Sequence, residues 1–376
     1  GADVNAQEVS GSTALMHAAW STDSVEIINT LIAAGADVNA QEDDGFTALM
    51  HAALSTKNAE IVNALIAAGA DVNAQEDDGS TALLEAAWSP EKVEIVNTLI
   101  AAGADVNVKD EDGNTALIIA SQSRDNSEII NALIAAGADV NARDGEGLTS
   151  LFYAADYGAN QEIIEALIHV GADVNVQDSE GETVLTLLLS SSSEPEIINT
   201  LIEAGPDLTG LSGSDLTDLL EILYLDFSKD LIKSFIDLGL NVNARGESGE
   251  TLLMFAAMAY DDSEIAKSLI EAGADINARG EYGFTALHFA SLSSPQVATT
   301  LIEAGADINA RNEDGFTALM IASGNTQNPE LIVRLLEAGA DATLTDSYGD
   351  KAIDRAEDNE ALRGTDAYWQ LNDASF

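Results

Sequence analysis

The sequence predicts an all-α solenoid of about ten helix–turn–helix repeats, and three observations indicate this fold class. Glycine recurs every 34 residues over long stretches, beginning with Gly11, Gly45 and Gly79. Each interval contains two short apolar segments with the spacing of a helix face. The chain has no cysteine, and its apolar runs fall short of the roughly 18 residues that a membrane helix needs. A fixed period of this length is typical of a repeat array, whose units bury their apolar faces against one another.

Residues 45–78 show how one repeat is built. The hydroxyl of Thr47 can cap the N-terminus of a short first helix. Leu49, Ala52 and Ala53 then stand at positions i, i+3 and i+4 and form one narrow apolar face. The neighbouring repeats carry the same face one period away, so we expect the first helices to stack closely.

A second helix is expected from about residue 59 to residue 68, and Gly69 ends it because glycine adopts the positive φ of a helix C-terminus. Proline suits the first turn of a helix, and four of the five prolines lie at the start of a second helix: Pro90, Pro195, Pro295 and Pro329. Ser89, Ser294 and Asn328 precede three of these prolines as candidate caps. The Asp-Val-Asn-Ala segment that follows each second helix predicts a short hairpin-like loop.

These motifs resemble the ankyrin repeat family. The residues that carry the resemblance are Gly-Phe-Thr-Ala-Leu-Met-His-Ala-Ala over 45–53, Glu-Ile-Val-Asn-Ala-Leu-Ile over 60–66 and Gly-Ala-Asp-Val-Asn-Ala over 69–74, and the pattern recurs about ten times. The resemblance implies an ankyrin repeat solenoid that binds proteins, with the first helices lining a concave groove. Alanine replaces the proline of the family's Thr-Pro-Leu-His, and only His288 keeps the histidine. We expect an apolar contact to replace that histidine's hydrogen bond in the other repeats.

Three parts are expected along the chain. An N-terminal block of six repeats covers residues 1–205, a degenerate seventh repeat covers 206–248, and a C-terminal block with a cap covers 249–376. Tyr368, Trp369 and Leu371 are expected to cover the last apolar face. The helix pairs are expected at about 11–35, 45–69, 79–103, 113–137, 147–171, 181–205, 213–239, 249–273, 283–305 and 315–339.

The seventh repeat departs from the pattern at Pro206, which replaces an alanine, and its loop over 207–212 is two residues short. Its first helix is expected around 216–225 and its second over 230–238. Two interpretations follow: drift in a structural repeat, or a joint at which the array can flex because each repeat is held only by its neighbours.

Charge is the most unusual feature, because 65 Asp and Glu face 15 Lys and Arg for a net charge of −50. Such a chain repels nucleic acid and anionic membrane surfaces, so its partners are expected to be basic proteins, basic peptides or cations. Acidity also serves solubility or life at high salt. The chain begins with a Gly-Ala-Asp-Val-Asn-Ala repeat end, so we expect it to start within a repeat or beside a lost signal or cap, and the localisation stays open.

Enzyme chemistry is not indicated, and no cofactor or metal is expected. His17 and His51 stand at equivalent positions of adjacent repeats and are interpreted as stacked surface residues; a metal pair there would lack further ligands. The segment 110–113 lacks the spacing of a calcium loop and is interpreted as a solvated turn.

The candidate binding residues form two columns. In each first helix, the residue before Ala-Ala and the residue three positions later share one face. Aromatic and Met side chains of this kind are typical anchors at the centres of interfaces. The same pattern is also expected if adjacent first helices bury these side chains against each other. The pairs are His17/Trp20, His51/Leu54, Glu85/Trp88, Ile119/Gln122, Tyr153/Asp156, Leu187/Ser190, Phe255/Met258, Phe289/Leu292 and Ile321/Gly324.

The second column lies at the loop tips. Acidic triplets such as Glu42-Asp43-Asp44 recur there, and aromatic residues border them: Phe46, Phe284, Phe316, Tyr282 and Tyr348. An acidic rim around an apolar trough suits a basic, partly apolar protein segment.

The function predicted from the sequence is non-catalytic binding of a basic and partly apolar protein by a monomeric scaffold, through the concave groove and the loop tips. Two alternatives stay open: an inhibitor or immunity-type protein that masks a basic site, and a salt-tolerant structural spacer.

Overall fold

The computed structural model describes residues 3–21, 24–55, 57–158, 161–190, 195–209, 211, 215, 219, 229–246, 248–259 and 263–376. Within these residues the regular structure is helical, apart from three isolated β-bridges that join the two arms of a loop, such as Gln41 with Thr47. The expected all-α class is therefore confirmed for the described part of the chain.

The chain divides into two compact units, Gly1–Pro206 and Asp207–Phe376. In the first unit, the first helices of the repeats are α1 (Ala14–Ser21), α3 (Ala48–Ser55), α5 (Ala82–Ala87), α7 (Ala116–Ser121), α9 (Ser150–Asp156) and α11 (Val184–Ser190). The second helices are α2 (Val25–Ala33), α4 (Ala59–Ala67), α6 (Val93–Ala101), α8 (Ser127–Ala135), α10 (Gln161–His169) and α12 (Pro195–Glu203).

The second unit continues the same alternation. Its first helices are α15 (Leu252–Ala259), α17 (Ala286–Ser293), α19 (Ala318–Asn325) and α21 (Ala352–Ala356). Its second helices are α14 (Lys229–Asp237), α16 (Ser263–Glu271), α18 (Pro295–Glu303), α20 (Pro329–Glu337) and α22 (Asp366–Ala374). The expected first helix of the seventh repeat, around 216–225, lies outside the described residues except for residue 219, and α14 corresponds to the expected second helix.

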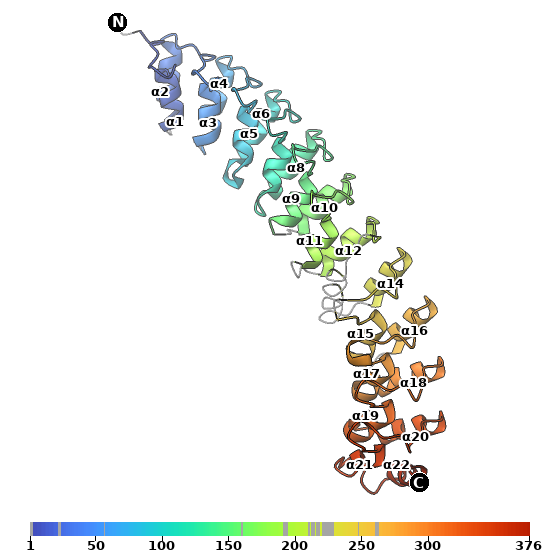
Figure 1. Cartoon of the computed structure of the whole chain (residues 1–376). Helices are drawn as coiled ribbons and strands as arrows, with labels where there is room; N and C mark the ends of the chain where they lie inside the picture. Colours follow the sequence, from blue (N-terminus) through green and yellow to red (C-terminus); the bar gives the residue numbers. More distant parts are fainter. Residues whose placement is uncertain are drawn as a thin grey trace. The chain divides into compact units, whose positions relative to one another are not determined.

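Each unit has two helical layers (Figure 1). First helices pack on first helices, as α1, α3 and α5 do, and second helices pack on second helices, as α2, α4 and α6 do. The core lies between the layers and repeats with the sequence: Leu49 and Leu65 are almost fully buried, and so are Leu83 and Leu99 one repeat later. Every repeat therefore buries its apolar face only by contacting its neighbours.

The predicted helix ends are largely confirmed. The Thr47 hydroxyl accepts a hydrogen bond from the Met50 N–H at 3.3 Å, and Gly69 has a φ of 94° after α4. Ser294 and Asn328 cap α18 and α20 with their side chains. Ser89 was expected to cap a helix in the same way, and this prediction is wrong: a 3₁₀ turn over Pro90–Lys92 precedes α6, and the Ser89 side chain makes no capping hydrogen bond.

Asparagine side chains join the loops of consecutive repeats. The Asn73 side chain donates from Nδ2 to the Gly103 carbonyl at 3.2 Å and accepts at Oδ1 from the Asp105 N–H at 2.8 Å. Asn39 makes the same two bonds to the repeat that follows it. Each asparagine thus satisfies one carbonyl at a helix end and one loop N–H, which fixes the spacing of adjacent loops.

Backbone hydrogen bonds also join the loop tips. The Asp77 N–H donates to the Asp44 carbonyl at 2.7 Å, and the Glu111 N–H donates to the Asp78 carbonyl at 2.7 Å. In the second unit the Glu313 N–H donates to the Tyr282 carbonyl at 2.9 Å. The acidic tips therefore form a continuous ridge over repeats two to four rather than separate flexible loops.

His288 is buried and occupies the structural role that the family resemblance implies. Its Nδ1 accepts from the Thr285 N–H at 3.1 Å, so Nε2 carries the proton and donates to the Phe316 carbonyl at 3.0 Å. Burial lowers the pKa of His288 and favours this neutral form. At the same position Met50 and Met320 are buried, as expected for an apolar replacement, but in the sixth repeat Thr186 instead accepts a hydrogen bond from the Thr183 N–H at 2.8 Å.

Candidate functional site

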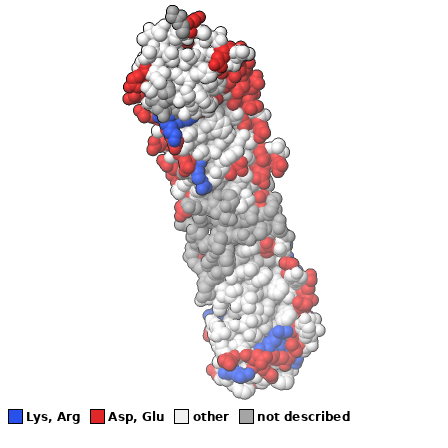
Figure 2. Space-filling view, turned by 90° about the vertical axis from the view of Figure 1, so that its left-hand side faces the viewer, with Lys and Arg blue, Asp and Glu red and all other residues white. Residues whose placement is uncertain are grey.

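An exposed apolar row runs along the first helices of the N-terminal unit. Trp20 of α1 and Trp88 at the end of α5 are each 52% exposed, and Leu54 of α3 is 36% exposed. Because α3 packs against both α1 and α5, these three side chains form one row, here called the N-terminal stripe. Figure 2 shows this unit as a mostly uncharged face bordered by Asp and Glu.

The second unit has a shorter row of the same kind. Met258 of α15 is 42% exposed, and Leu292 of α17 is 55% exposed. The two helices pack against each other, so the side chains belong to one face. Both rows consist of the second members of the predicted residue pairs.

The first members of the pairs lie deeper. His17 is exposed, Ile119 is buried, and the others are half-buried: His51, Glu85, Tyr153, Leu187, Phe255, Phe289 and Ile321. The interpretation of His51 as a surface residue is wrong. Its ring packs against Trp20 at 5.8 Å and against Phe46 at 4.6 Å between centroids, which covers it.

A contact between a loop-tip acid and the side chain nine residues later recurs along the chain, and we call it the tip–helix pair. Glu8 lies 3.4 Å from His17, and Glu42 lies 3.3 Å from His51. The Tyr153 hydroxyl donates to Asp144 at 2.6 Å. Near the C-terminus, Arg355 pairs with Asp346 in the same way. In four repeats, the acid therefore meets a side chain that can donate a proton or carry positive charge.

The third repeat differs from these four because both positions hold carboxylates, Glu76 and Glu85. Burial, together with the neighbouring carboxylates of Asp78, Glu85, Asp44 and Asp77, raises the pKa of Glu76 to about 7. Burial and Asp78 also raise the pKa of Glu85. Glu85 is among the groove residues predicted from the sequence and Glu76 is not, although the spacing of nine residues between an acid and a groove residue is readable in the sequence.

Lys92 is a positively charged residue that acts electrostatically on Glu85 of this pair. It is buried, and its ammonium group donates to the Leu54 carbonyl at 2.6 Å. Burial lowers the pKa of Lys92, and the Lys92 charge in turn favours the ionised form of Glu85. Lys92 therefore lies beneath the N-terminal stripe and links α3 to the repeat after it.

The other cations before Gly205 also join repeats. Lys57 pairs with Glu91, and the Lys109 ammonium group donates to the Arg143 carbonyl at 2.6 Å. Arg124 donates to the Gly158 carbonyl at 2.6 Å, and Arg143 lies 3.4 Å from Asp173. All five cations of this region, Lys92 included, are thus engaged within the array, while the acidic tips project from it.

The predicted tip aromatics are only partly accessible. Phe46 is half-buried against His51, Phe284 stacks on Phe289 with ring centroids 5.4 Å apart, and the Arg355 guanidinium lies 4.2 Å above the Phe316 ring. The most exposed aromatic side chains at the tips are Tyr282 at 60% and Tyr348 at 76%.

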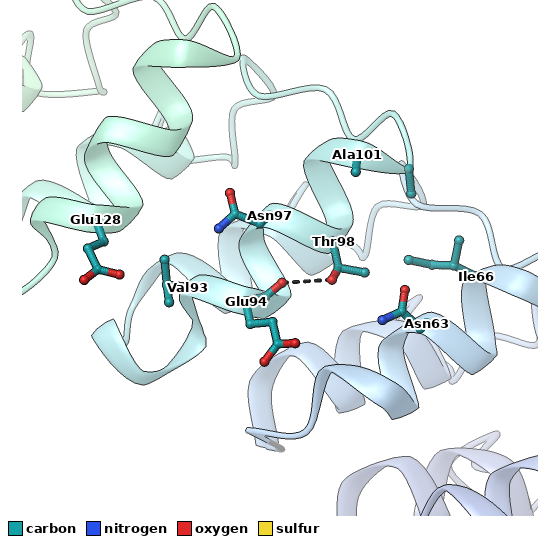
Figure 3. A pocket seen from close by; sticks show the side chains of 9 residues that line it. Asn63, Ile66, Val93, Glu94, Asn97, Thr98, Ala101 and Glu128 are labelled. Carbon is teal, nitrogen blue, oxygen red and sulfur yellow. Dashed lines mark hydrogen bonds between the residues drawn. The ribbon is translucent and has the colours of Figure 1, made fainter.

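A groove of about 600 Å³ lies on the second helices of the N-terminal unit. Figure 3 shows that Asn63 and Ile66 of α4 face Asn97, Thr98 and neighbouring residues of α6 across it, with Glu128 of α8 at its far side. The Thr98 hydroxyl is used within its own helix, where it donates to the Glu94 carbonyl at 2.8 Å. The groove carries no convergent set of acid, base and nucleophile among its lining residues.

Among the described residues, no helix is long and apolar enough to cross a membrane, and no group of three or more His, Asp or Glu side chains could hold a metal ion.

Comparison with known families gives a match over most of the chain. A family model described as ankyrin repeats in three copies matches residues 1–76, 49–144, 83–178, 117–211 and 222–312. A second one, described as ankyrin repeats in many copies, matches residues 301–356. A search of curated proteins found no match.

Proposed function

Since the chain belongs to the ankyrin repeat family, whose members generally mediate protein–protein interaction and are typically non-enzymatic scaffolds, we propose that it binds a basic and partly apolar protein through the face of its first helices and its acidic loop tips. The observation that carries the proposal is the N-terminal stripe. Two half-exposed tryptophans in one row are an exposed apolar surface of the kind that interfaces use as anchors.

The charge distribution supports a basic partner. The net charge of the chain is −50, and the cations of the N-terminal unit are engaged within the array. Binding then proceeds in two stages: the acidic surface accelerates encounter with a positively charged partner, and the tryptophans bury apolar area once the complex forms. The partner-binding residues in this proposal are His17, Trp20, His51, Leu54, Glu85, Trp88, Tyr153, Phe255, Met258, Phe289, Phe46, Phe284 and Phe316.

The test is affinity capture from the native source with the immobilised protein and with a Trp20→Ala/Trp88→Ala variant. We expect a basic protein to be retained by the unchanged protein and lost with the variant. Its association rate should fall steeply as salt is raised, because screening removes the steering but not the apolar contact. A Glu94→Gln variant, altered on the second helices, is the matched control and should retain the partner. Identical retained proteins for all three would contradict the proposal, and retention insensitive to salt would contradict its electrostatic part.

A further inference from the structure

The third repeat differs from its neighbours at the point where the N-terminal stripe meets the acidic ridge. In repeats one and two the tip–helix pair joins an acid to a histidine, at 3.4 Å for Glu8 and His17 and at 3.3 Å for Glu42 and His51. Repeat three replaces the histidine by Glu85 and keeps the acid as Glu76. In four other repeats this position holds a side chain that can donate a proton to the acid or carry positive charge, whereas in repeat three it holds a second acid.

Trp88 lies about one helical turn from Glu85 of this pair. It follows Glu85 by three residues, which places the two side chains on the same face of α5, and half of its surface is open to solvent. A cationic group placed between the two glutamates can also contact the face of the indole ring, and carboxylates and aromatic rings both attract such groups.

We propose that Trp88, Glu76 and Glu85 together receive a lysine or arginine side chain of a basic partner segment that lies along the N-terminal stripe. This inference rests on the proposed function and assigns one recognition point within it. The partner's cation gives Glu76 the kind of partner that a histidine gives the equivalent acid in repeats one and two. Leu54 and Trp20, in the same row, receive apolar side chains of the same segment.

The surroundings make this recognition dependent on pH. The charged groups around Glu76 are Asp44 on the preceding tip, Asp77 and Asp78 on its own tip and Glu85 on α5; they and burial hold the pKa of Glu76 at about 7. Lys92 acts on Glu85, and His51 of α3 faces Glu42 instead. A bound cation favours the ionised form of Glu76, so binding releases a proton when the pH is below about 7. Affinity should therefore rise from pH 6 to pH 8 by roughly tenfold.

The experiment uses the full chain and a labelled peptide of alternating arginine and leucine, because arginine keeps its charge throughout this pH range. We expect the unchanged protein to bind about tenfold more tightly at pH 8 than at pH 6. Glu76→Gln should bind more weakly at pH 8 and lose most of the pH dependence. Glu94→Gln, with the same charge change on the second helix of the same repeat, should keep it. A peptide of alternating glutamate and leucine should not bind.

The outcomes separate the two proposals. If Trp88→Ala abolishes binding but Glu76→Gln keeps the original pH dependence, the recognition point is wrong and the proposed function stands. If the arginine–leucine peptide does not bind, or binds Trp88→Ala as well as the unchanged protein, both proposals fail. Glu85→Gln provides a second variant of the same pair, and circular dichroism of each variant shows that it is folded. Removing one of two neighbouring negative charges is not expected to impair folding.

Discussion

Replacement of Trp88 by alanine separates a binding anchor from a core residue, and the structure gives the size of the effect. A tryptophan side chain has an area of roughly 200 Å², and the 52% exposure of Trp88 leaves about half of it covered in the fold. At about 25 cal/mol per Å², the covered half corresponds to about 2 kcal/mol of unfolding free energy. A fully buried aromatic residue would give about 3–5 kcal/mol.

The assay is urea unfolding followed by circular dichroism, with Leu83→Ala as the comparison on the same helix. Leu83 is completely buried, so its truncation should destabilise the protein by about 2–5 kcal/mol. Trp88→Ala should destabilise it by no more than about 2 kcal/mol. In binding, the same change should weaken the complex by about 2 kcal/mol or more, which is roughly thirtyfold. A loss of stability of 4 kcal/mol or more for Trp88→Ala would refute the reasoning, because it would mean that the side chain belongs to the core.

Two further predictions concern the array itself. In a urea titration, Asn73→Ala should lower the unfolding free energy by about 1–2 kcal/mol, because two hydrogen bonds to the next repeat are lost. Asn97→Ala, on the exposed face of α6, should change the unfolding free energy by less than about 0.5 kcal/mol. An equal effect of the two would contradict the role of the asparagine in joining repeats. Because the pKa of His288 is lowered in the folded protein, the unfolded chain binds a proton at this histidine at a higher pH than the folded protein does. The contribution of His288 to the unfolding free energy is therefore complete above the ordinary pKa of 6.5 and declines as the pH falls below it. His288→Met, which installs the residue found at Met50 and Met320, should lose less stability between pH 7.5 and pH 5 than the unchanged protein does. If the unfolding free energies of the two proteins fall in parallel with pH, the buried histidine is not the source of the pH dependence.

Much of the fold could be predicted from the sequence because each repeat carries its own local signals. Thr47 before α3 and Gly69 after α4 mark helix ends through backbone chemistry that acts within a few residues, and the period of 34 identifies the array. Ser89 shows the limit of such signals: the motif resembles Ser294 before Pro295, yet a 3₁₀ turn intervenes and the cap is not made. The organisation into two blocks with a joint at 206–248 stays a prediction.

The candidate site needed the tertiary structure. Spacing along α1, α3 and α5 identifies which residues share a face, and the sequence by itself determined that Trp20, Leu54 and Trp88 occupy equivalent positions. It could not decide that these side chains are half-exposed while His51 is covered by Phe46 and Trp20, because exposure depends on the neighbouring helix and on the loop that folds over it. The raised pKa of Glu76 has the same origin, since desolvation and the field of four carboxylates act through space, and Asp44 and Glu85 approach Glu76 only when adjacent repeats stack.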